Sequence, residues 1–505
     1  MTAAVHRVGI VGAGAMGRGI AQVCALAGCD VLLLDSQPEA VARAIEAIRA
    51  ELAQSVAKGR LPREQADAAV TRLRGAASLA ELAGCELVVE AIVERLDAKQ
   101  ALLRELEAIV GPACILATNT SSLSVTAIAA ACAQPQRVAG WHFFNPVPRM
   151  KLVEVVRAPR TAEPVVQALL ALSERIGHRA VVTGDSPGFV VNHAGRAFVT
   201  EGLKLLAERC AEHAVIDGIL RAAGFRMGPF ELLDLTALDV SVPVMESIHA
   251  QYYGDDRYRP VALARTRLQA GLLGRKSGEG FYRYSAGAAA DAAPAAAPPP
   301  AASPGAIRPW WPTEGPAVLP PAIAAVLPAR HADARTADLC LVAPLGADLS
   351  TTVAELGLDA AKAVAVDPLF CGKAGVTLMG CPATAAASIE SAKALFAAQT
   401  MPVFVVADTP GFVAPRVVAG IVNLACEMAQ QGVASPSDID AAVRLGLGYP
   451  AGPFEWGDRL GAGRVLQVLQ GLQTTFGDPR YRPSPWLLRR AKLGLPLGTP
   501  DRSGW

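Results

Sequence analysis

The sequence predicts an α/β protein in which a Rossmann-type doubly wound sheet is followed by an all-α helical domain, with a degenerate second copy of both. Three observations lead to this prediction. Strand-like apolar runs alternate with helical stretches from Arg7 to Gly184, a glycine-rich loop follows the first run, and three short motifs recur downstream. Alternating strands and helices are typical of a mostly parallel sheet with helices on both faces.

Size and composition narrow the class of protein. The chain has 505 residues, enough for several domains, with 18% charged residues and a formal net charge of +1. This balance, without a long basic run, argues against nucleic acid or an anionic membrane as the main partner. Charges or prolines interrupt the apolar stretches, so we expect no membrane span, and the first residues lack the pattern of a signal peptide.

The ten cysteines are scattered along the chain and form no C-x-x-C pair. Free thiols of this kind are typical of a reducing compartment, so we expect a cytoplasmic location. Because no cysteines or histidines recur at ligand spacing, we expect no metal site.

The first predicted strand, VGIV, leads into the loop GAGAMG, a G-x-G-x-x-G pattern made by Gly12, Gly14 and Gly17. The pattern alone is a weak signal, but here a strand precedes it and a helix follows it. The glycines allow a tight turn, a close approach to a pyrophosphate and close packing of helix on strand. The helix N-terminus then faces the phosphates, and we include Met16 of the loop among the cofactor-binding residues.

An acidic residue ends the second predicted strand. Asp35 follows VLLL, 23 residues after Gly12, where a carboxylate can accept hydrogen bonds from the ribose hydroxyls of the cofactor. A carboxylate there would repel a 2′-phosphate, which favours NAD over NADP. The alternative is a solvated aspartate at a strand end.

A histidine and a glutamate flank a predicted turn. GWHFF is interpreted as a strand, NPVPRM as a turn and KLVEVV as a returning strand, which places His142 near Glu154. A carboxylate that binds one ring nitrogen fixes the tautomer and leaves the other nitrogen to act as a base. The alternative is a core histidine satisfied by the backbone, although a buried carboxylate also needs a partner.

Three motifs of the first half recur in the second half in the same order, 223 or 224 residues later. They are DSPGFVV at Asp185, GPFELLD at Gly228 and GDDRYRP at Gly254, repeated as DTPGFVA at Asp408, GPFEWGD at Gly452 and GDPRYRP at Gly477. A constant offset indicates a duplication of a helical unit. Between the copies lies an Ala/Pro-rich stretch, which is typical of a semi-rigid linker.

These features divide the chain into five parts. We expect a NAD-binding Rossmann-like domain at 1–184, a helical domain at 185–284, a linker at 285–308, a degenerate Rossmann-like segment at 309–407 and a second, non-catalytic helical copy at 408–505.

Five stretches together resemble the NAD-dependent L-3-hydroxyacyl-CoA dehydrogenases: GAGAMGRGIAQVCALAG, VVEAIVE, NTSSLSVTAIA, GWHFFNPVPRMKLVEVV and DSPGFVVN. The resemblance covers residues 5 to 284. The tandem layout resembles the long bacterial branch of this family, which includes 3-hydroxyadipyl-CoA dehydrogenases of phenylacetate breakdown and 3-hydroxybutyryl-CoA dehydrogenases. It implies an acyl-CoA thioester substrate, NAD as cofactor, and a place in fatty-acid β-oxidation or phenylacetate catabolism.

The resemblance also implies a role for each matching residue. The implied catalytic base is His142, its partner is Glu154, the implied substrate contacts are Ser121, Asn192 and Lys58, and the implied cofactor contacts are Glu94, Lys99 and Asn145. One departure is His193, where the family usually has arginine, and this puts the support around Asn192 in doubt.

Most of these residues also have a structural alternative. Ser121 and Ser122 could cap the following helix, and Asn145 could be a turn residue. Lys58 could be a solvated charge, and Glu94 with Lys99 could form a surface helix pair.

The second half is expected to lack the chemistry. By the same offset, Glu154 falls opposite Thr377, the HFFNP stretch opposite VAVDP at 364–368, and Asn192 opposite Pro415, and no glycine loop precedes them. Family members with one helical domain dimerise through it. We therefore expect either a homodimer or a second copy that takes the place of a partner subunit and braces the site around Asn192.

Two other classes of function compete with this hypothesis. A β-hydroxyacid dehydrogenase shares the nucleotide fold but uses a catalytic lysine, which the histidine–glutamate pair argues against. A crystallin-like protein could bind NAD without turnover, and fold alone does not exclude it.

Overall fold

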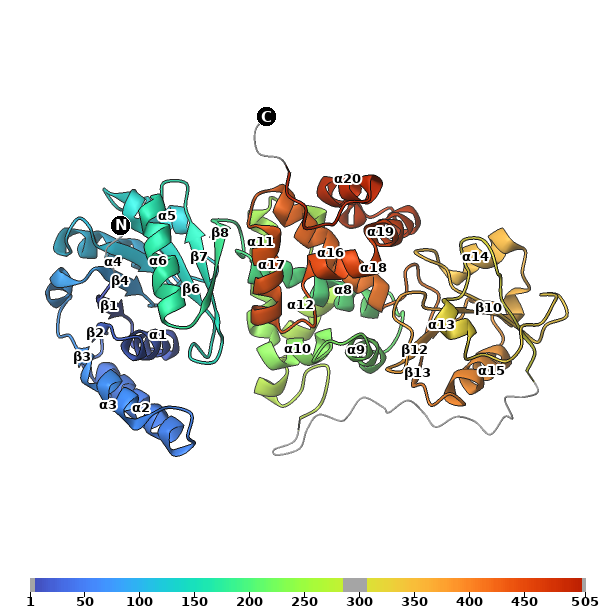
Figure 1. Ribbon diagram of the computed structural model, residues 1–505, viewed down its shortest axis with the longest axis horizontal. Coiled ribbons are helices and arrows are strands. Elements are labelled where there is room, and N and C mark those ends of the chain that lie inside the picture. The colour runs from blue at the N-terminus through green and yellow to red at the C-terminus, as the bar shows by residue number, and fades with distance from the viewer. Residues whose placement is uncertain (1–4, 285–306, 502–505) are drawn as a thin grey trace. The chain divides into compact units, whose positions relative to one another are not determined.

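The computed structural model describes residues 5–284 and 307–501. These residues form two compact units (Figure 1). One holds the chain up to His193 together with Gln431–Leu447, and the other holds Ala194–Gln430 and the chain from Gly448 onward. Most of the expected linker, residues 285–306, lies outside the described residues.

The first unit is built on an eight-stranded sheet in the order β3-β2-β1-β4-β5-β6-β7-β8. Its strands are β1 (Arg7–Val11), β2 (Asp30–Leu34), β3 (Leu73–Gly75), β4 (Leu87–Glu90), β5 (Ile115–Thr118), β6 (Val138–Phe143), β7 (Leu152–Arg157) and β8 (Arg179–Gly184). All neighbours are parallel except β6 and β7. The doubly wound prediction is confirmed. The short strand β3 was missed because three residues carry no recognisable pattern.

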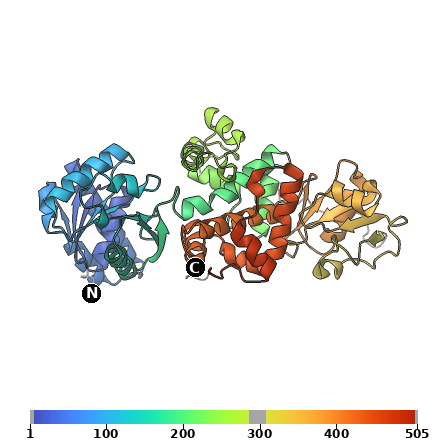
Figure 2. The same cartoon turned by 90° about the horizontal axis from the view of Figure 1, so that it is seen from above.

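Helices cover both faces of this sheet (Figure 2). They are α1 (Ala15–Leu26), α2 (Pro38–Ala57), α3 (Arg63–Thr71), α4 (Leu96–Ile109), α5 (Val125–Ala129) and α6 (Glu163–Arg175). One apolar cluster joins the sheet to α1, α2, α3 and α6, and a second joins the opposite face to α4 and α5. The fully buried strands therefore need apolar residues on both sides, which explains their continuous apolar runs.

A segment of the second half packs onto the edge of this first sheet. The segment contains α17 (Pro436–Ala442) and the π-helical turn η7 (Val443–Leu447). The Gly184 N–H at the end of β8 donates to the Val433 carbonyl at 2.8 Å, and Arg179 pairs with Asp438 at 3.0 Å. The segment thereby protects an otherwise open edge strand.

The second unit combines the helices of both copies. The first copy supplies α8 (Arg196–Ala207), α9 (His213–Ala222), α10 (Pro229–Thr236), α11 (Leu238–Gln251) and α12 (Ala262–Gln269), and the short α7 (Val191–Ala194) precedes them. The second copy supplies α16 (Ala414–Gln430), α18 (Pro453–Leu460), α19 (Ala462–Phe476) and α20 (Pro485–Leu493).

The two helical copies meet through reciprocal contacts. Arg257 donates to the carbonyl of Arg482 at 3.2 Å, and Arg480 donates to the carbonyl of Arg259 at 2.6 Å. Residues 257 and 480 are equivalent in the two copies, as are 259 and 482. Exchange of the same contact in both directions is the signature of a two-fold interface, here formed within one chain.

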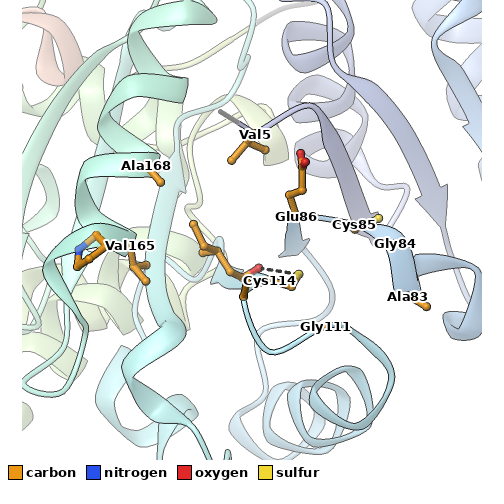
Figure 3. Close-up of a pocket in the computed structure, with 12 residues that line it drawn as sticks. Val5, Ala83, Gly84, Cys85, Glu86, Gly111, Cys114, Val165 and Ala168 are labelled. Atoms are coloured by element: carbon orange, nitrogen blue, oxygen red, sulfur yellow. Dashed lines mark hydrogen bonds between the residues drawn. The ribbon is translucent and has the colours of Figure 1, made fainter. Parts of the chain in front are cut away.

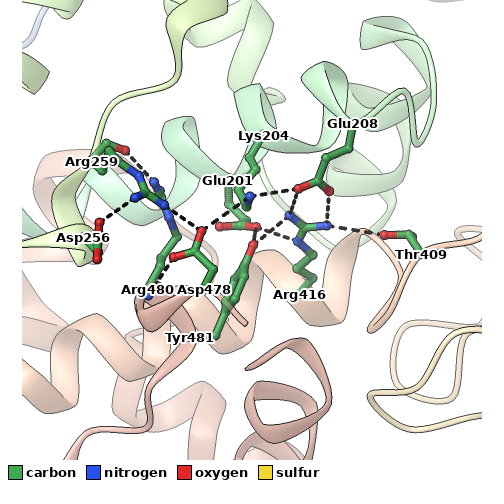
Figure 4. Close-up of polar contacts among 10 residues, drawn as sticks. All are labelled: Glu201, Lys204, Glu208, Asp256, Arg259, Thr409, Arg416, Asp478, Arg480 and Tyr481. Atoms are coloured by element: carbon green, nitrogen blue, oxygen red, sulfur yellow. Dashed lines mark hydrogen bonds and ion pairs between the residues drawn. The ribbon is translucent and has the colours of Figure 1, made fainter. Parts of the chain in front are cut away.

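A buried ion cluster crosses the same interface (Figure 4). The guanidinium of Arg416, on α16, is fully buried and donates to Glu201 at 2.5 Å, to Glu208 at 2.7 Å and to the Tyr481 hydroxyl at 2.8 Å. The Tyr481 hydroxyl in turn donates to Glu201 at 2.7 Å. Because every partner is satisfied, removal of any one would leave a buried charge unpaired.

The second unit also contains a five-stranded sheet in the order β13-β12-β11-β10-β9. Its strands are β9 (Pro309–Trp310), β10 (Leu339–Val342), β11 (Ala363–Val366), β12 (Val376–Met379) and β13 (Val403–Val406), and its helices are α13 (Pro321–Ala324), α14 (Leu349–Leu356) and α15 (Ala386–Ala397). Only β11 and β12 are antiparallel. Order and directions match β8 to β4 of the first sheet, so the half that would correspond to β1, β2 and β3 is missing among the described residues.

This match corrects the alignment of the two halves. In the first sheet His142 faces Glu154, whereas in the second Val366 faces Leu378. The position equivalent to Glu154 is therefore Leu378 rather than Thr377, and His142 corresponds to Val366, two residues beyond the position expected from VAVDP. Two apolar residues thus stand where the first copy has its acid and base.

No helix in the described part of the chain is long and apolar enough to cross a membrane.

Asp217 provides a test of the helical packing in the second unit. This buried carboxylate on α9 accepts hydrogen bonds from the Phe230 and Glu231 N–H groups, at 3.1 and 3.0 Å, and from the Tyr282 hydroxyl at 2.7 Å. Burial raises the pKa of Asp217 to about 7. The folded state therefore binds more protons than the unfolded state below pH 7, and the free energy of unfolding falls as the pH rises from about 4 to 7.

We expect the thermal midpoint of the parent to fall between pH 5 and pH 8, and to fall less in Asp217→Asn, which does not titrate. Scanning calorimetry at a series of pH values would check this. Parallel pH profiles for the two proteins would contradict the assignment to Asp217.

Candidate active site

The glycine loop lies at the carboxyl edge of the first sheet, where the chain order reverses between β1 and β4. Ligands of doubly wound sheets bind at this switch point. Gly12 has φ +111°, and a Cβ there would lie 2.4 Å from the Ala91 carbonyl oxygen. A Cβ on Gly17 would lie 1.8 Å from the Gly12 oxygen, whereas a Cβ on Gly14 would meet no atom within 4 Å. Gly14 thus leaves open the space that a pyrophosphate needs in front of α1.

Asp35 stands at the end of β2, beside the glycine loop. Its carboxylate accepts hydrogen bonds from the Ala13 N–H at 2.7 Å and from the Gln37 N–H at 3.0 Å. Partial burial alone would raise the pKa of Asp35, but these hydrogen bonds lower it below its usual value. Met16 is half-buried in the first turn of α1 and packs against the core. An ionised carboxylate here suits ribose hydroxyls and disfavours a 2′-phosphate, so these residues fit NAD.

His142 and Glu154 face each other across the antiparallel pair β6 and β7. Their Nδ1 and Oε2 atoms are 2.6 Å apart, the histidine is 4% exposed and the glutamate is fully buried. An ionised Glu154 accepts the Nδ1 proton, so Nε2 carries the lone pair. No other described residue forms a hydrogen bond with Nε2. The proximity expected from the sequence is confirmed.

The other oxygen of Glu154 is held by the start of α7. Oε1 accepts hydrogen bonds from the Val190 and Val191 N–H groups, each at 2.9 Å. The ring of His142 also lies 4.5 Å from the ring of Phe144 and 5.7 Å from that of Phe189. The acid is therefore fully bonded and the imidazole is fixed in orientation, as a general base requires.

The loop after β5 carries Ser121 close to Asn192. The side-chain amide of Asn192 donates to the Ser121 carbonyl at 3.4 Å, and Asn192 directly follows the segment that binds Glu154. Ser121 is exposed and Asn192 is half-buried. The structure therefore brings together the base, its partner, the serine and the asparagine in one unit.

The helix cap assigned as an alternative role for Ser121 and Ser122 belongs to Ser124. Its side chain accepts the Ala127 N–H at the start of α5, and its hydroxyl donates to Asp185 at 2.7 Å. The two earlier serines are instead bound to Glu94, whose Oε1 accepts hydrogen bonds from the Ser121 N–H at 2.9 Å and the Ser122 hydroxyl at 3.0 Å.

Lys99 is not part of an exposed helix pair. It is 1% exposed, and its ammonium lies 3.2 Å from Glu94 and also contacts Glu90, which is fully buried. Sequence reasoning missed Glu90. The available signal was a glutamate that directly ends the apolar strand LVVE at the carboxyl edge of the sheet.

Two of the expected contacts are less defined. Asn145 is exposed in the turn between β6 and β7, where the Pro146 carbonyl accepts the Arg149 N–H at 2.9 Å. Lys58 is exposed at the C-terminus of α2. Both stay predictions, since the protein side of each contact consists of a solvated side chain.

A separate cavity of about 410 Å³ lies at the opposite, amino edge of the sheet (Figure 3). It is lined mainly by apolar residues before β4 and β5 and on α6, with Glu86 as its charged member. Its place at the amino edge excludes it as the cofactor crevice. Among the described residues no cluster of histidine, cysteine or carboxylate side chains could hold a metal ion.

Comparisons with known proteins agree with this site. Residues 7–186 match the family model described as 3-hydroxyacyl-CoA dehydrogenase, NAD binding domain, and residues 188–284 and 411–503 match the C-terminal domain of that family. The chain is 38% identical over 496 residues to 3-hydroxyadipyl-CoA dehydrogenase of Escherichia coli K12, covering 97% of this chain and 98% of that protein.

Shorter relatives and solved structures give the same result. A probable 3-hydroxybutyryl-CoA dehydrogenase of Deinococcus radiodurans is 42% identical over 279 residues, which is 55% of this chain and all of that protein. The crystal structure of 3-hydroxybutyryl-CoA dehydrogenase from E. coli K12 superposes with a TM-score of 0.86 at 37% identity, covering 97% of this chain and 99% of that one.

The glycine loop, the facing histidine and glutamate and the duplicated helical domain thus occur together in a chain whose matches extend over nearly its full length. The chain belongs to the 3-hydroxyacyl-CoA dehydrogenase family.

Proposed function

We propose that this chain oxidises (S)-3-hydroxyacyl-CoA to 3-oxoacyl-CoA with His142 as the general base. The observation that carries the proposal is the 2.6 Å contact between His142 Nδ1 and a fully buried Glu154. In this arrangement Nε2 takes the hydroxyl proton of the substrate, and the carboxylate stabilises the imidazolium that results. Bound NAD supplies the hydride acceptor.

The neighbouring residues orient the reacting groups. Ser121 and Asn192 lie beside each other and are assigned to the substrate, with the serine contacting its oxygen. Gly12, Gly14, Met16, Gly17 and Asp35 are assigned to the adenosine and pyrophosphate, and Glu94, Lys99 and Asn145 to the nicotinamide half. Lys58 is assigned to the phosphates of CoA. The alternative of a crystallin-like, non-catalytic protein is disfavoured by the intact base and its partner.

The preferred acyl group is proposed to carry a terminal carboxylate. A relative that shares the whole tandem layout is named for 3-hydroxyadipyl-CoA, whereas several relatives that match only the first half are named for 3-hydroxybutyryl-CoA. The alternative is a four-carbon substrate, the one named for the full-length E. coli crystal structure.

The second half is proposed to brace the catalytic unit in place of a partner subunit. A Cβ on Gly446, in η7, would lie 2.9 Å from side-chain carbons of both Leu152 and Val191. Leu152 begins β7, two residues before Glu154, and the Val191 N–H binds Glu154 itself. The second copy therefore touches the two segments that hold the carboxylate.

Replacement of the base tests the proposed chemistry. We expect His142→Gln to lower kcat/KM by about 10²–10⁴-fold, because proton transfer by a positioned base contributes about that much. The measurement is NADH oxidation with acetoacetyl-CoA, and NADH binding should be retained. His331→Gln, in the second sheet, is the matched control with expected parental rates; a His142→Gln rate equal to that of this control would contradict the assignment.

A panel of three substrates tests the acyl preference. We expect kcat/KM to be highest for 3-hydroxyadipyl-CoA, lower for 3-hydroxyhexanoyl-CoA, which has the same length without the carboxylate, and lower for 3-hydroxybutyryl-CoA. Equal values for the two six-carbon substrates would show that the terminal carboxylate is not recognised.

A change in the second half tests the bracing role. We expect Gly446→Val to lower kcat by about tenfold, because the added carbons displace Leu152 and Val191 and shift Glu154 by fractions of an ångström. Gly463→Val, on α19, is the control, since a Cβ there meets no atom within 4 Å. Steady-state kinetics would separate the two, and equal kcat values would refute the brace.

A further inference from the structure

Three charged side chains are buried together at the carboxyl end of β4. Glu90 ends the strand and is fully buried, and Lys99, on α4, is 1% exposed. The Lys99 ammonium contacts Glu90 Oε1 and lies 3.2 Å from Glu94 Oε2. We call Glu90, Lys99 and Glu94 the buried triad.

Both carboxylates of the triad are bonded as ionised acceptors. Glu90 accepts hydrogen bonds from the Ile92 N–H at 3.0 Å and the Thr118 hydroxyl at 2.7 Å, in addition to Lys99. Glu94 accepts the Thr120 hydroxyl at 2.7 Å and the Ser121 N–H at 2.9 Å. Its partial burial would raise the pKa of Glu94, but these donors and the Lys99 charge lower it below its usual value.

The triad therefore carries one ammonium and two carboxylates, for a net charge of −1. Glu90 and Lys99 are almost fully enclosed, so solvent screens this charge much less than it would screen a charge on the surface. The charge extends toward the crevice through Glu94, whose side chain is 38% exposed.

The strand order places the triad at one half of the cofactor crevice. Asp35, at the end of β2, marks the adenosine half, on the β1 side of the switch point. Glu90 and Thr118 end β4 and β5, on the other side of the switch point. In a doubly wound dinucleotide site this second half receives the nicotinamide.

We propose that the buried triad makes the crevice prefer oxidised NAD⁺ over NADH. The nicotinamide ring of NAD⁺ carries a positive charge that the ring of NADH lacks, so a fixed charge of −1 stabilises only the oxidised form. The inference rests on the proposed function, since it takes the crevice to be the NAD site. It assigns to Glu90 and Lys99 a role through charge rather than through contact with the cofactor.

The charge can be changed without changing the size of the side chains. Glu90→Gln brings the triad to zero, and the double variant Glu90→Gln/Lys99→Met returns it to −1 through Glu94 alone. We expect the ratio of the dissociation constants of NADH and NAD⁺ to fall about tenfold in Glu90→Gln and to return toward the parental ratio in the double variant. Calorimetry with each nucleotide in the absence of substrate measures both constants.

Asp35→Asn is the matched control. It also neutralises a carboxylate, but at the adenosine half, so it should weaken NAD⁺ and NADH equally and leave their ratio unchanged. Glu94→Gln is a second neutralising variant. It should lower the ratio as Glu90→Gln does, and it keeps the test open should the buried single variant fail to fold.

The possible outcomes separate the inference from the proposed function. Equal weakening of both nucleotides in Glu90→Gln or Glu94→Gln, or a double variant with the same ratio as Glu90→Gln, would overturn the charge mechanism while leaving the NAD site intact. Failure of the parent to bind either nucleotide would overturn the proposed function itself.

Discussion

The site depends on a fully buried carboxylate that has no access to water. Glu154 is satisfied by the His142 ring and by two backbone N–H groups, from Val190 and Val191. An ionised carboxylate at such depth is tolerated only when all these donors are in place. The strand pair β6 and β7, the start of α7 and the glutamate therefore form one cooperative structure, and the orientation of His142 follows from it.

The antiparallel pairing of β6 and β7 is what permits this structure. In a parallel pair, residues that face each other are separated by a whole crossover, whereas a hairpin-like return brings positions twelve residues apart into register. The short connection also means that the sequence itself reveals the partner, since the histidine and the glutamate occur within one motif. The second sheet keeps the same antiparallel pair with Val366 facing Leu378, so the architecture outlasts the chemistry.

Sequence alone predicts those parts of the structure that depend on local patterns. Buried parallel strands carry apolar runs, the glycine loop carries its own signature, and a constant offset reveals the duplication. It does not predict that Glu90 and Lys99 are buried together, because their contact depends on how α4 packs against β4, and charged residues in a helix usually face solvent. Nor does it predict that Gly446 lies against Leu152, since nearly 300 residues separate them. The roles assigned to Asn145 and Lys58 depend on ligands, which local patterns do not determine.

The second half shows what a duplicated domain retains once catalysis is lost. Its first three strands and glycine loop have no counterpart in the described residues, yet the carboxylate that caps the helix after the third remaining element persists: Asp408 accepts the Leu349 N–H at 2.8 Å, as Asp185 accepts the Val125 N–H at 3.1 Å.

Packing has replaced the site in this second copy. A Cβ on Gly471, in α19, would lie 2.3 Å from the Gly346 carbonyl oxygen, so the loop after β10 and this helix meet backbone to backbone. The equivalent loop of the first copy carries Ser121 and Ser122, whose polar groups bind Glu94. Close approach of two glycines leaves no space for a ligand, and it fixes the second sheet to its own helical copy. A rigid second half, in turn, is what allows η7 to hold Val191 and, through it, the carboxylate on which the base depends.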